Sequence, residues 1–121
     1  MALALEKPIV EVFEPTGAIN AKQLATLLGL SQTELAKAIG RDRAAISRNT
    51  TSASVQKGLA EILALFMRVL RLTGNRQDLA RIWLHAPNPA LDHERPVDFL
   101  TRRKLRVLDS VISAVEEGVP D

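Results

Sequence analysis

Apolar residues recur every three or four positions along most of this chain, which is the period of α-helices that bury one face. Short groups of Gly, Pro, Asn, Asp and Ser separate these stretches, and such groups end helices and form turns. No segment has the pattern of a strand, an internal repeat or a low-complexity tract. The pattern therefore predicts an all-α protein with about seven helices.

An N-terminal arm, residues 1–19, precedes the helices and ends with the breaker residues 14–17. The longest predicted helix runs from Ser54 to Leu72 and is apolar on more than one side, so more than one side of it must be buried. The other predicted helices lie between Asn20 and Gly29, between Ser31 and Gly40, at 43–48, from Asn75 or Asp78 to residue 84, at 97–100 after Pro96, and at 103–117.

Side chains that can cap helices stand at several of these starts. Asn20 and Asp42 each precede a predicted helix and can accept a hydrogen bond from its first turn. Ser31 with Glu34 three residues later has the spacing of a capping box. These caps support the predicted boundaries in the N-terminal half.

Residues 32–48 have the spacing of a helix-turn-helix motif. Ala36 is small, so that the following helix can pack across it, and Gly40 can adopt the left-handed turn between the two helices. Ile46, six residues beyond Gly40, anchors the last helix of the motif, which is the recognition helix. This spacing predicts a DNA-binding domain in residues 20–64.

The outward positions of this motif carry residue types that can contact DNA. Arg can bond bidentately to guanine, Ser can reach base edges or phosphate, and an Ala methyl can touch thymine, whereas residues of the preceding helix would contact the backbone. The predicted DNA-contacting residues are Gln32, Lys37, Arg43, Ala44, Ser47 and Arg48. The alternative is that these are ordinary solvated residues of a unit retained for folding or dimerisation.

Composition narrows the possible functions. A chain of 121 residues has room for one compact domain or two small lobes that share a core, but not for a catalytic domain beside a binding domain. Apolar residues make up 46% and aromatic residues only 3%, which predicts an aliphatic core. Without Cys there is neither a disulfide nor a thiolate metal site, and we expect a cytoplasmic protein. No apolar run suits a signal peptide or a membrane span, and a net charge of +2 does not by itself indicate DNA binding.

The sequence does not predict an enzyme. It has no Tyr, no Gly-rich phosphate loop and no nucleophile with a paired base. Trp83, His85 and His93 are best interpreted as structural residues, and the adjacent side chains of Asp92, His93 and Glu94 point apart and so do not suit a metal ion. We therefore expect no metal, no cofactor and no small-molecule substrate.

The C-terminal half carries a more specific pattern. Trp-Leu at residues 83 and 84 is followed by Pro-Asn-Pro-Ala-Leu at 87–91, a Pro-led helix with buried apolar residues at 96–100, and Glu-Glu-Gly at 116–118. This pattern resembles the toxin-binding domain of Xre/MbcA/ParS antitoxins, and the upstream helix-turn-helix matches the domain order of that family. One departure is the loop Asp-His-Glu at 92–94, where small residues including Gly are expected.

The resemblance implies an antitoxin of a type II toxin–antitoxin system. Its C-terminal domain, residues 65–121, would neutralise a RES-domain toxin that consumes NAD by covering the active site of that toxin, and its N-terminal domain would bind promoter DNA and autoregulate the operon. The resemblance implies toxin contacts in the 96–100 helix, the basic cluster after it and the acidic chain end. The expected toxin-binding residues are Pro96, Val97, Phe99, Arg102, Arg103, Arg106, Glu116, Glu117, Gly118 and Val119.

Two further expectations concern partners. The apolar sides of the 54–72 helix, together with the two-fold symmetry of many helix-turn-helix sites, predict a homodimer. The last predicted helix has basic residues at its start and acidic residues at its end, an order that its dipole disfavours, and this indicates a partner for the acidic end. Two alternatives remain, namely a helix-turn-helix repressor without a toxin partner and a purely structural interaction module.

Overall fold

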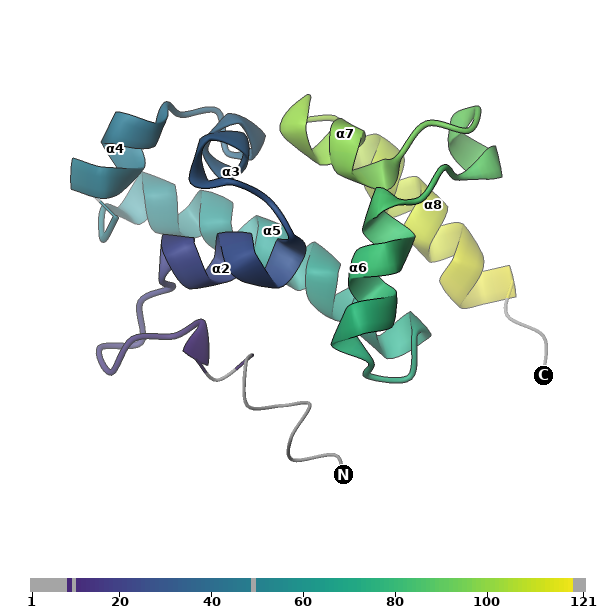
Figure 1. Cartoon of the computed structure of the whole chain (residues 1–121), viewed down its shortest axis with the longest axis horizontal. Coiled ribbons are helices and arrows are strands. Elements are labelled where there is room, and N and C mark those ends of the chain that lie inside the picture. Colours follow the sequence, from purple (N-terminus) through teal and green to yellow (C-terminus); the bar gives the residue numbers. More distant parts are fainter. Residues whose placement is uncertain (1–8, 10, 49, 119–121) are drawn as a thin grey trace.

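The structure is a computed structural model that describes residues 9, 11–48 and 50–118. Within these residues it contains seven α-helices, one 3-10 helix and, in place of strands, two isolated β-bridges. Figure 1 shows their arrangement, and the all-α prediction is confirmed. The elements are α2 (Ala21–Leu28), α3 (Gln32–Ala38), α4 (Arg43–Arg48), α5 (Ala53–Leu72), α6 (Gln77–His85), η1 (Pro89–Leu91), α7 (Pro96–Thr101) and α8 (Leu105–Gly118).

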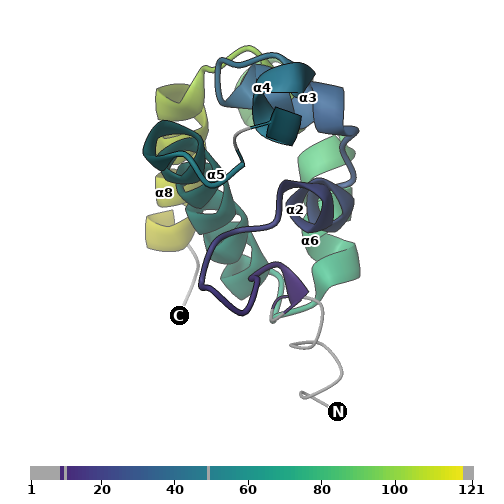
Figure 2. The same cartoon turned by 90° about the vertical axis from the view of Figure 1, so that its left-hand side faces the viewer.

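Helix α5 is the central element of the fold. In Figure 1, α2, α3 and α4 lie along its N-terminal part, and α6, α7 and α8 gather around its C-terminal part. Seen from the side in Figure 2, α8 lies next to α5 while α6 lies next to α2. Because α5 continues without interruption through residues 64 and 65, the predicted DNA-binding and toxin-binding regions share one helix.

One aliphatic core extends through both halves of the fold. On α5 the buried residues of the predicted apolar stripe include Leu59, Ile62 and Phe66. The apolar residues outside that stripe are half-buried against the core, namely Leu65, Met67 and Leu72. The core cluster continues from α2 and α3 through α5 to α8. The prediction that α5 is buried on more than one side is therefore confirmed.

The predicted caps are present. The Asn20 side chain accepts a hydrogen bond from the N–H of Gln23, and the Asp42 carboxylate accepts one from the N–H of Ala45 at 2.7 Å. Ser31 and Glu34 form both bonds of the capping box, with N–O distances of 3.0 and 2.8 Å. Local sequence thus determines where α2, α3 and α4 begin.

Four helix starts differ from the prediction, and that of α7 differs only in including Pro96. Helix α5 begins one residue before Ser54, because the Ser52 hydroxyl caps it. Neither Asn75 nor Asp78 caps α6: Asn75 has a left-handed φ of 62° in the preceding turn, and Asp78 already lies within the first turn. Helix α8 begins at Leu105 and not at residue 103, since the turn before it is also left-handed.

Part of the predicted N-terminal arm folds against α5. Phe13 and Ile19 form an antiparallel bridge that closes a tight turn, and Val12 beside it is fully buried. The side-chain amide of Gln56 accepts a hydrogen bond from the Ile19 N–H and donates one to the Ile19 carbonyl, at 2.8 and 3.0 Å. Residues 1–8 and 10 of the predicted arm lie outside the described residues.

Gly58 lies where α5 packs closely against the end of α3. A Cβ atom on Gly58 would stand 2.9 Å from the Cβ of Ile39, which cannot move without its backbone. Gly-to-Ala substitution in a helix ordinarily stabilises by about 1 kcal/mol. Here we expect Gly58→Ala to lower the free energy of unfolding by about 1–3 kcal/mol, because the added methyl overpacks the contact.

Urea unfolding followed by circular dichroism measures this change. Gly118→Ala is the matched control, since a Cβ at this other helical glycine would meet nothing within 4 Å. An increase in stability for Gly58→Ala would contradict the packing described here.

Candidate functional site

The helix-turn-helix motif has the local geometry that its spacing predicts. Ala36 is fully buried, and Ile46 is 2% exposed. Gly40 has a φ of 74°, and the turn is closed by the Arg41 N–H, which donates to the Ala36 carbonyl at 2.8 Å. Helix α4 is thereby anchored on one face and leaves its other face to solvent.

The outward face of α4 carries the side chains predicted to contact DNA. Arg43, Ala44, Ser47 and Arg48 are exposed and together line a shallow depression. Within the part of the chain that the structure describes, neither arginine forms an ion pair. Both guanidinium groups are therefore available to an anionic partner.

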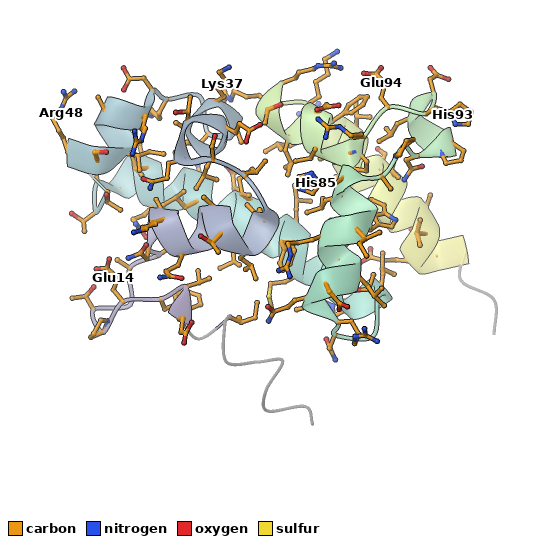
Figure 3. All side chains as sticks on the ribbon, viewed as in Figure 1. Glu14, Lys37, Arg48, His85, His93 and Glu94 are labelled. Carbon is orange, nitrogen blue, oxygen red and sulfur yellow. The ribbon has the colours of Figure 1, made fainter. Side chains whose placement is uncertain are left out.

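The two predicted backbone contacts lie on the preceding helix. Lys37 is exposed in the last turn of α3, and Gln32 is half-buried in its first turn. Figure 3 shows the Lys37 and Arg48 side chains pointing outward from α3 and α4. The motif thus presents cations from both of its helices, as phosphate contacts require.

The second candidate region begins with the turn between α6 and α7. Asn88 organises it, because its carboxamide oxygen accepts from the Ala90 N–H and its main chain bonds with both His93 and Glu94, each at 2.9 Å. Asp92 and His93 both have left-handed φ angles, 54° and 66°. The turn therefore adopts a conformation that suits Gly even though neither residue is Gly, which explains why small residues were expected there.

The two histidines of the chain lie in different surroundings. The His85 Nε2 lies 3.0 Å from the Leu28 carbonyl oxygen and so joins the end of α6 to the end of α2. Figure 3 shows His85 between these elements, whereas His93 and Glu94 lie at the periphery. Trp83 is half-buried against the core. These positions agree with a structural role for Trp83 and His85.

The side chains expected to contact a toxin fall into two groups. Pro96, Val97 and Phe99 of α7 are buried and form part of the core. The basic residues that follow, Arg102, Arg103 and Arg106, are exposed. Because they are buried, the three α7 side chains can support a binding surface but do not form part of it. Val119 lies outside the described residues.

The acidic end of α8 packs back on the fold. The Arg68 guanidinium of α5 donates to the Glu116 carboxylate at 2.8 and 3.2 Å, to the Ser113 hydroxyl at 3.0 Å and to the Asp109 carboxylate. The apolar spacing of the 103–117 helix predicts that Val115 is its last buried residue and that the acidic end projects beyond it. This prediction was wrong, because the last buried residue of α8 is Ile112 and Val115 is 38% exposed. Glu116 already has a cationic partner within the chain.

Arg68 also accounts for the charge order of α8. Its hydrogen bonds lower the pKa of the Glu116 carboxyl below its ordinary value, and Glu116 in turn raises the pKa of Arg68. The acidic residues that the α8 dipole disfavours are thus compensated by α5, so an external partner is not needed to explain them. Only Glu117 of this acidic pair remains exposed without an ion pair among the described residues.

Sequence reasoning missed two features of this region. Val107 and Val115 are 40% and 38% exposed, and with half-buried Val111 they form an apolar stripe along α8. Their spacing of four residues is visible in the sequence, but sequence reasoning assigned Val111 and Val115 to the inward face and did not single out Val107. The second feature is a groove between α5 and α8, which is lined by Leu65 and Arg68 of α5 and by Leu105, Arg106 and Asp109 of α8, among others.

The fold and these surfaces define a class: a small helical protein that joins an exposed helix-turn-helix motif to a second domain with its own exposed surface. Residues 68–118 match the family described as the antitoxin Xre/MbcA/ParS C-terminal toxin-binding domain. The match runs from Arg68 to Gly118 and so includes both sides of the Arg68–Glu116 pair. This C-terminal region is therefore similar to the toxin-binding domain of Xre/MbcA/ParS antitoxins.

The fold is similar to that of a chain from the M. tuberculosis MbcT–MbcA toxin–antitoxin complex, solved as a crystal structure. The TM-score is 0.52 at 24% sequence identity, and the match covers 84% of this chain and 94% of that chain. No curated protein matches the sequence. Among the described residues, no helix is both long enough and apolar enough to cross a bilayer.

The Arg68–Glu116 contact gives a testable pH dependence. A carboxyl whose pKa is lowered by folding stabilises the native state above its unfolded pKa, and this contribution is lost as the pH falls through the folded pKa. We therefore expect the melting temperature of the wild type to fall from about pH 5 to about pH 3 more steeply than that of Glu116→Gln.

Thermal melts across this pH range measure the difference. Glu117→Gln is the control, since this neighbouring carboxylate is exposed and makes no ion pair among the described residues. Equal slopes for the wild type and Glu116→Gln would show that the contact does not hold the end of α8.

Proposed function

We propose that this chain is the antitoxin of a type II toxin–antitoxin system, which neutralises a RES-domain, NAD-consuming toxin and represses its own operon. The observation that supports this most directly is the connection, through α5, of an exposed helix-turn-helix surface to a domain of the toxin-binding family. The similar fold of a chain from a toxin–antitoxin complex agrees with it. A repressor without a toxin partner would leave the toxin-binding domain and its exposed stripe unexplained.

DNA binding would place α4 in the major groove. Arg43 and Arg48 would donate to guanine edges, Ser47 to a base edge or phosphate, and Lys37 to the backbone. The exposure of these side chains and the unpaired state of the two arginines in the described structure support this assignment. A homodimer would present two such helices to a two-fold operator.

Toxin binding would use the outer face of α8. An exposed apolar stripe bordered by charged residues is typical of protein interaction surfaces. Val107 and Val115 supply apolar area, and the exposed charged residues Arg106 and Glu117 lie on the same helix. Since Glu116 is held by Arg68, Glu117, which Gly118 follows, is the acidic group among the described residues of this chain end that could enter a cationic NAD pocket. Inhibition would follow from covering the active site of the toxin.

The DNA-binding surface is tested with the double variant Arg43→Ala and Arg48→Ala. Each bidentate contact to guanine contributes about 1–3 kcal/mol, so we expect at least a tenfold loss of affinity for the promoter duplex upstream of this gene. Fluorescence anisotropy measures the affinity. Arg76→Ala is the matched control, because this exposed arginine lies before α6 and pairs with Asp78.

Circular dichroism establishes that each DNA-binding variant is folded. Promoter binding by the folded double variant with wild-type affinity would place the DNA contact elsewhere on the chain.

The toxin-binding surface is tested by placing charge on the stripe. We expect Val107→Lys combined with Val115→Lys to weaken binding of the neighbouring gene's product and to release its toxicity on co-expression, because lysine cannot be desolvated in an apolar contact. Truncation after Val115 should act in the same direction. Ile82→Lys is the matched control, since Ile82 on α6 is 60% exposed and lies on another helix.

The truncation also removes the Glu116 carboxylate that pairs with Arg68. Glu116→Gln, which removes only this ion pair, is therefore the control for the truncation. Full neutralisation by both the lysine variant and the truncation would mean that α8 is not the inhibitory surface.

A further inference from the structure

Arg103 occupies a backbone position that suits glycine. Helix α7 ends in a turn in which the Arg103 N–H donates to the Leu100 carbonyl at 3.0 Å and the Lys104 N–H donates to the Phe99 carbonyl at 2.8 Å. In this helix-ending motif, the residue that donates the first of the two bonds has a left-handed conformation and is usually Gly. Arg103 has a φ of 60°.

Three other helices of the described structure end in the same motif with glycine. Gly29, Gly40 and Gly74 have φ angles of 73°, 74° and 69° after α2, α3 and α5, with the same pattern of backbone hydrogen bonds. A residue with a Cβ atom is strained in this conformation by roughly 1 kcal/mol. The turn itself does not need a side chain at residue 103, so a function of that side chain has to be sought in what it contacts.

The Arg103 side chain lies over the turn of the helix-turn-helix motif. A Cβ atom on Gly40 would stand 2.9 Å from the Arg103 Cζ and 3.0 Å from its Nε and Nη1. Helices α3 and α7 are in contact, so the end of one helix lies against the end of the other. An arginine of the C-terminal domain thus covers the turn that leads into the recognition helix.

The charge of Arg103 is not paired with an acidic side chain in the described structure. Its neighbour Arg102 donates to Glu94 at 2.8 Å and lies 5.7 Å from the centre of the Phe99 ring. Arg103 is exposed and forms no ion pair with any described residue. Asp42, which follows the turn of the motif, accepts the capping hydrogen bond of α4.

We propose that Arg103 binds a phosphate of the operator backbone, so that the C-terminal domain takes part in DNA binding. This inference rests on the proposed DNA-binding function and assigns Arg103 to DNA instead of to the toxin. The first residues of a recognition helix contact base edges, so the turn before them lies beside the phosphates that border the groove. Exposed Lys37 and Arg41 lie in or next to the same turn, and a guanidinium is well suited to a phosphate.

The test measures how DNA affinity depends on salt. The probes are the promoter duplex and an unrelated duplex of equal length, titrated with the full chain between about 50 and 200 mM KCl. Loss of one phosphate contact lowers the slope of log K against log[salt] by about 0.9, or about eightfold in affinity at 0.1 M salt. We expect Arg103→Met to show this loss on both duplexes, because phosphates carry no sequence information.

Two further variants separate charge from packing. Arg103→Lys keeps the charge and should retain the wild-type slope, whereas a role limited to covering Gly40 would make Lys and Met equivalent and leave the slope unchanged. Arg102→Met is the matched control, since this adjacent arginine is already paired with Glu94. It should not change the slope.

The outcomes also separate this inference from the proposed function. If the wild type binds neither duplex, DNA binding itself fails, and this inference fails with it. If the wild type binds, the Arg43 and Arg48 double variant does not, and Arg103→Met keeps the wild-type slope, only the role of Arg103 is refuted. Loss of toxin binding by Arg103→Met at an unchanged slope would assign Arg103 to the toxin surface.

Discussion

The burial of α5 on more than one side is the constraint on which the rest of the structure depends. A helix of 20 residues with apolar side chains outside a single stripe cannot remain in water, and each group of neighbouring helices covers a different part of it. The helix-turn-helix unit covers its N-terminal part, and the family-matched domain covers its C-terminal part. The two surfaces are therefore held by one core, with direct contacts of α3 with α7 and of α2 with α6.

Charge has a different role at each end of this core. On α4 the arginines are unpaired among the described residues, which leaves them free for an anionic partner. On α8 the acidic residues are held by Arg68, which fixes the chain end against α5. One surface thus presents unpaired cations, while the other offers apolar area and Glu117, an exposed acid that forms no ion pair in the described part of the chain.

Sequence alone predicted the features that local rules determine. Ala36, Gly40 and Ile46 obey short-range spacing, and the caps act on the next turn of chain, so both were predicted from neighbouring residues. The Arg68–Glu116 contact joins residues that are 48 positions apart, and such a pair cannot be predicted from helical periodicity. The contact of Arg103 with Gly40 likewise depends on how α7 packs on α3. Nothing in the neighbouring sequence indicates that this arginine has a left-handed backbone conformation.

Within residues 68–118, which match the antitoxin family, the sequence motif was more informative than its individual residues. The pattern of Pro, Asn and Leu at 87–91 marks a turn whose Asn88 bonds the structure confirms. The packing of α7 and α8 then determines which side chains face solvent. The α7 residues Pro96, Val97 and Phe99 are buried, whereas Val107 and Val115 of α8 are exposed. The family match located this region at residues 68–118, but its exposed surface could be identified only from the structure.

The central claim is that this chain neutralises an NAD-consuming toxin, and cellular NAD measures it most directly. The neighbouring gene is expressed in a heterologous bacterium with and without this chain, and NAD is assayed while growth is followed. Expression of the neighbouring gene alone is expected to deplete NAD and stop growth, and co-expression of the wild-type chain is expected to restore both. Persistent NAD depletion in the presence of soluble, folded wild-type chain would contradict the claim.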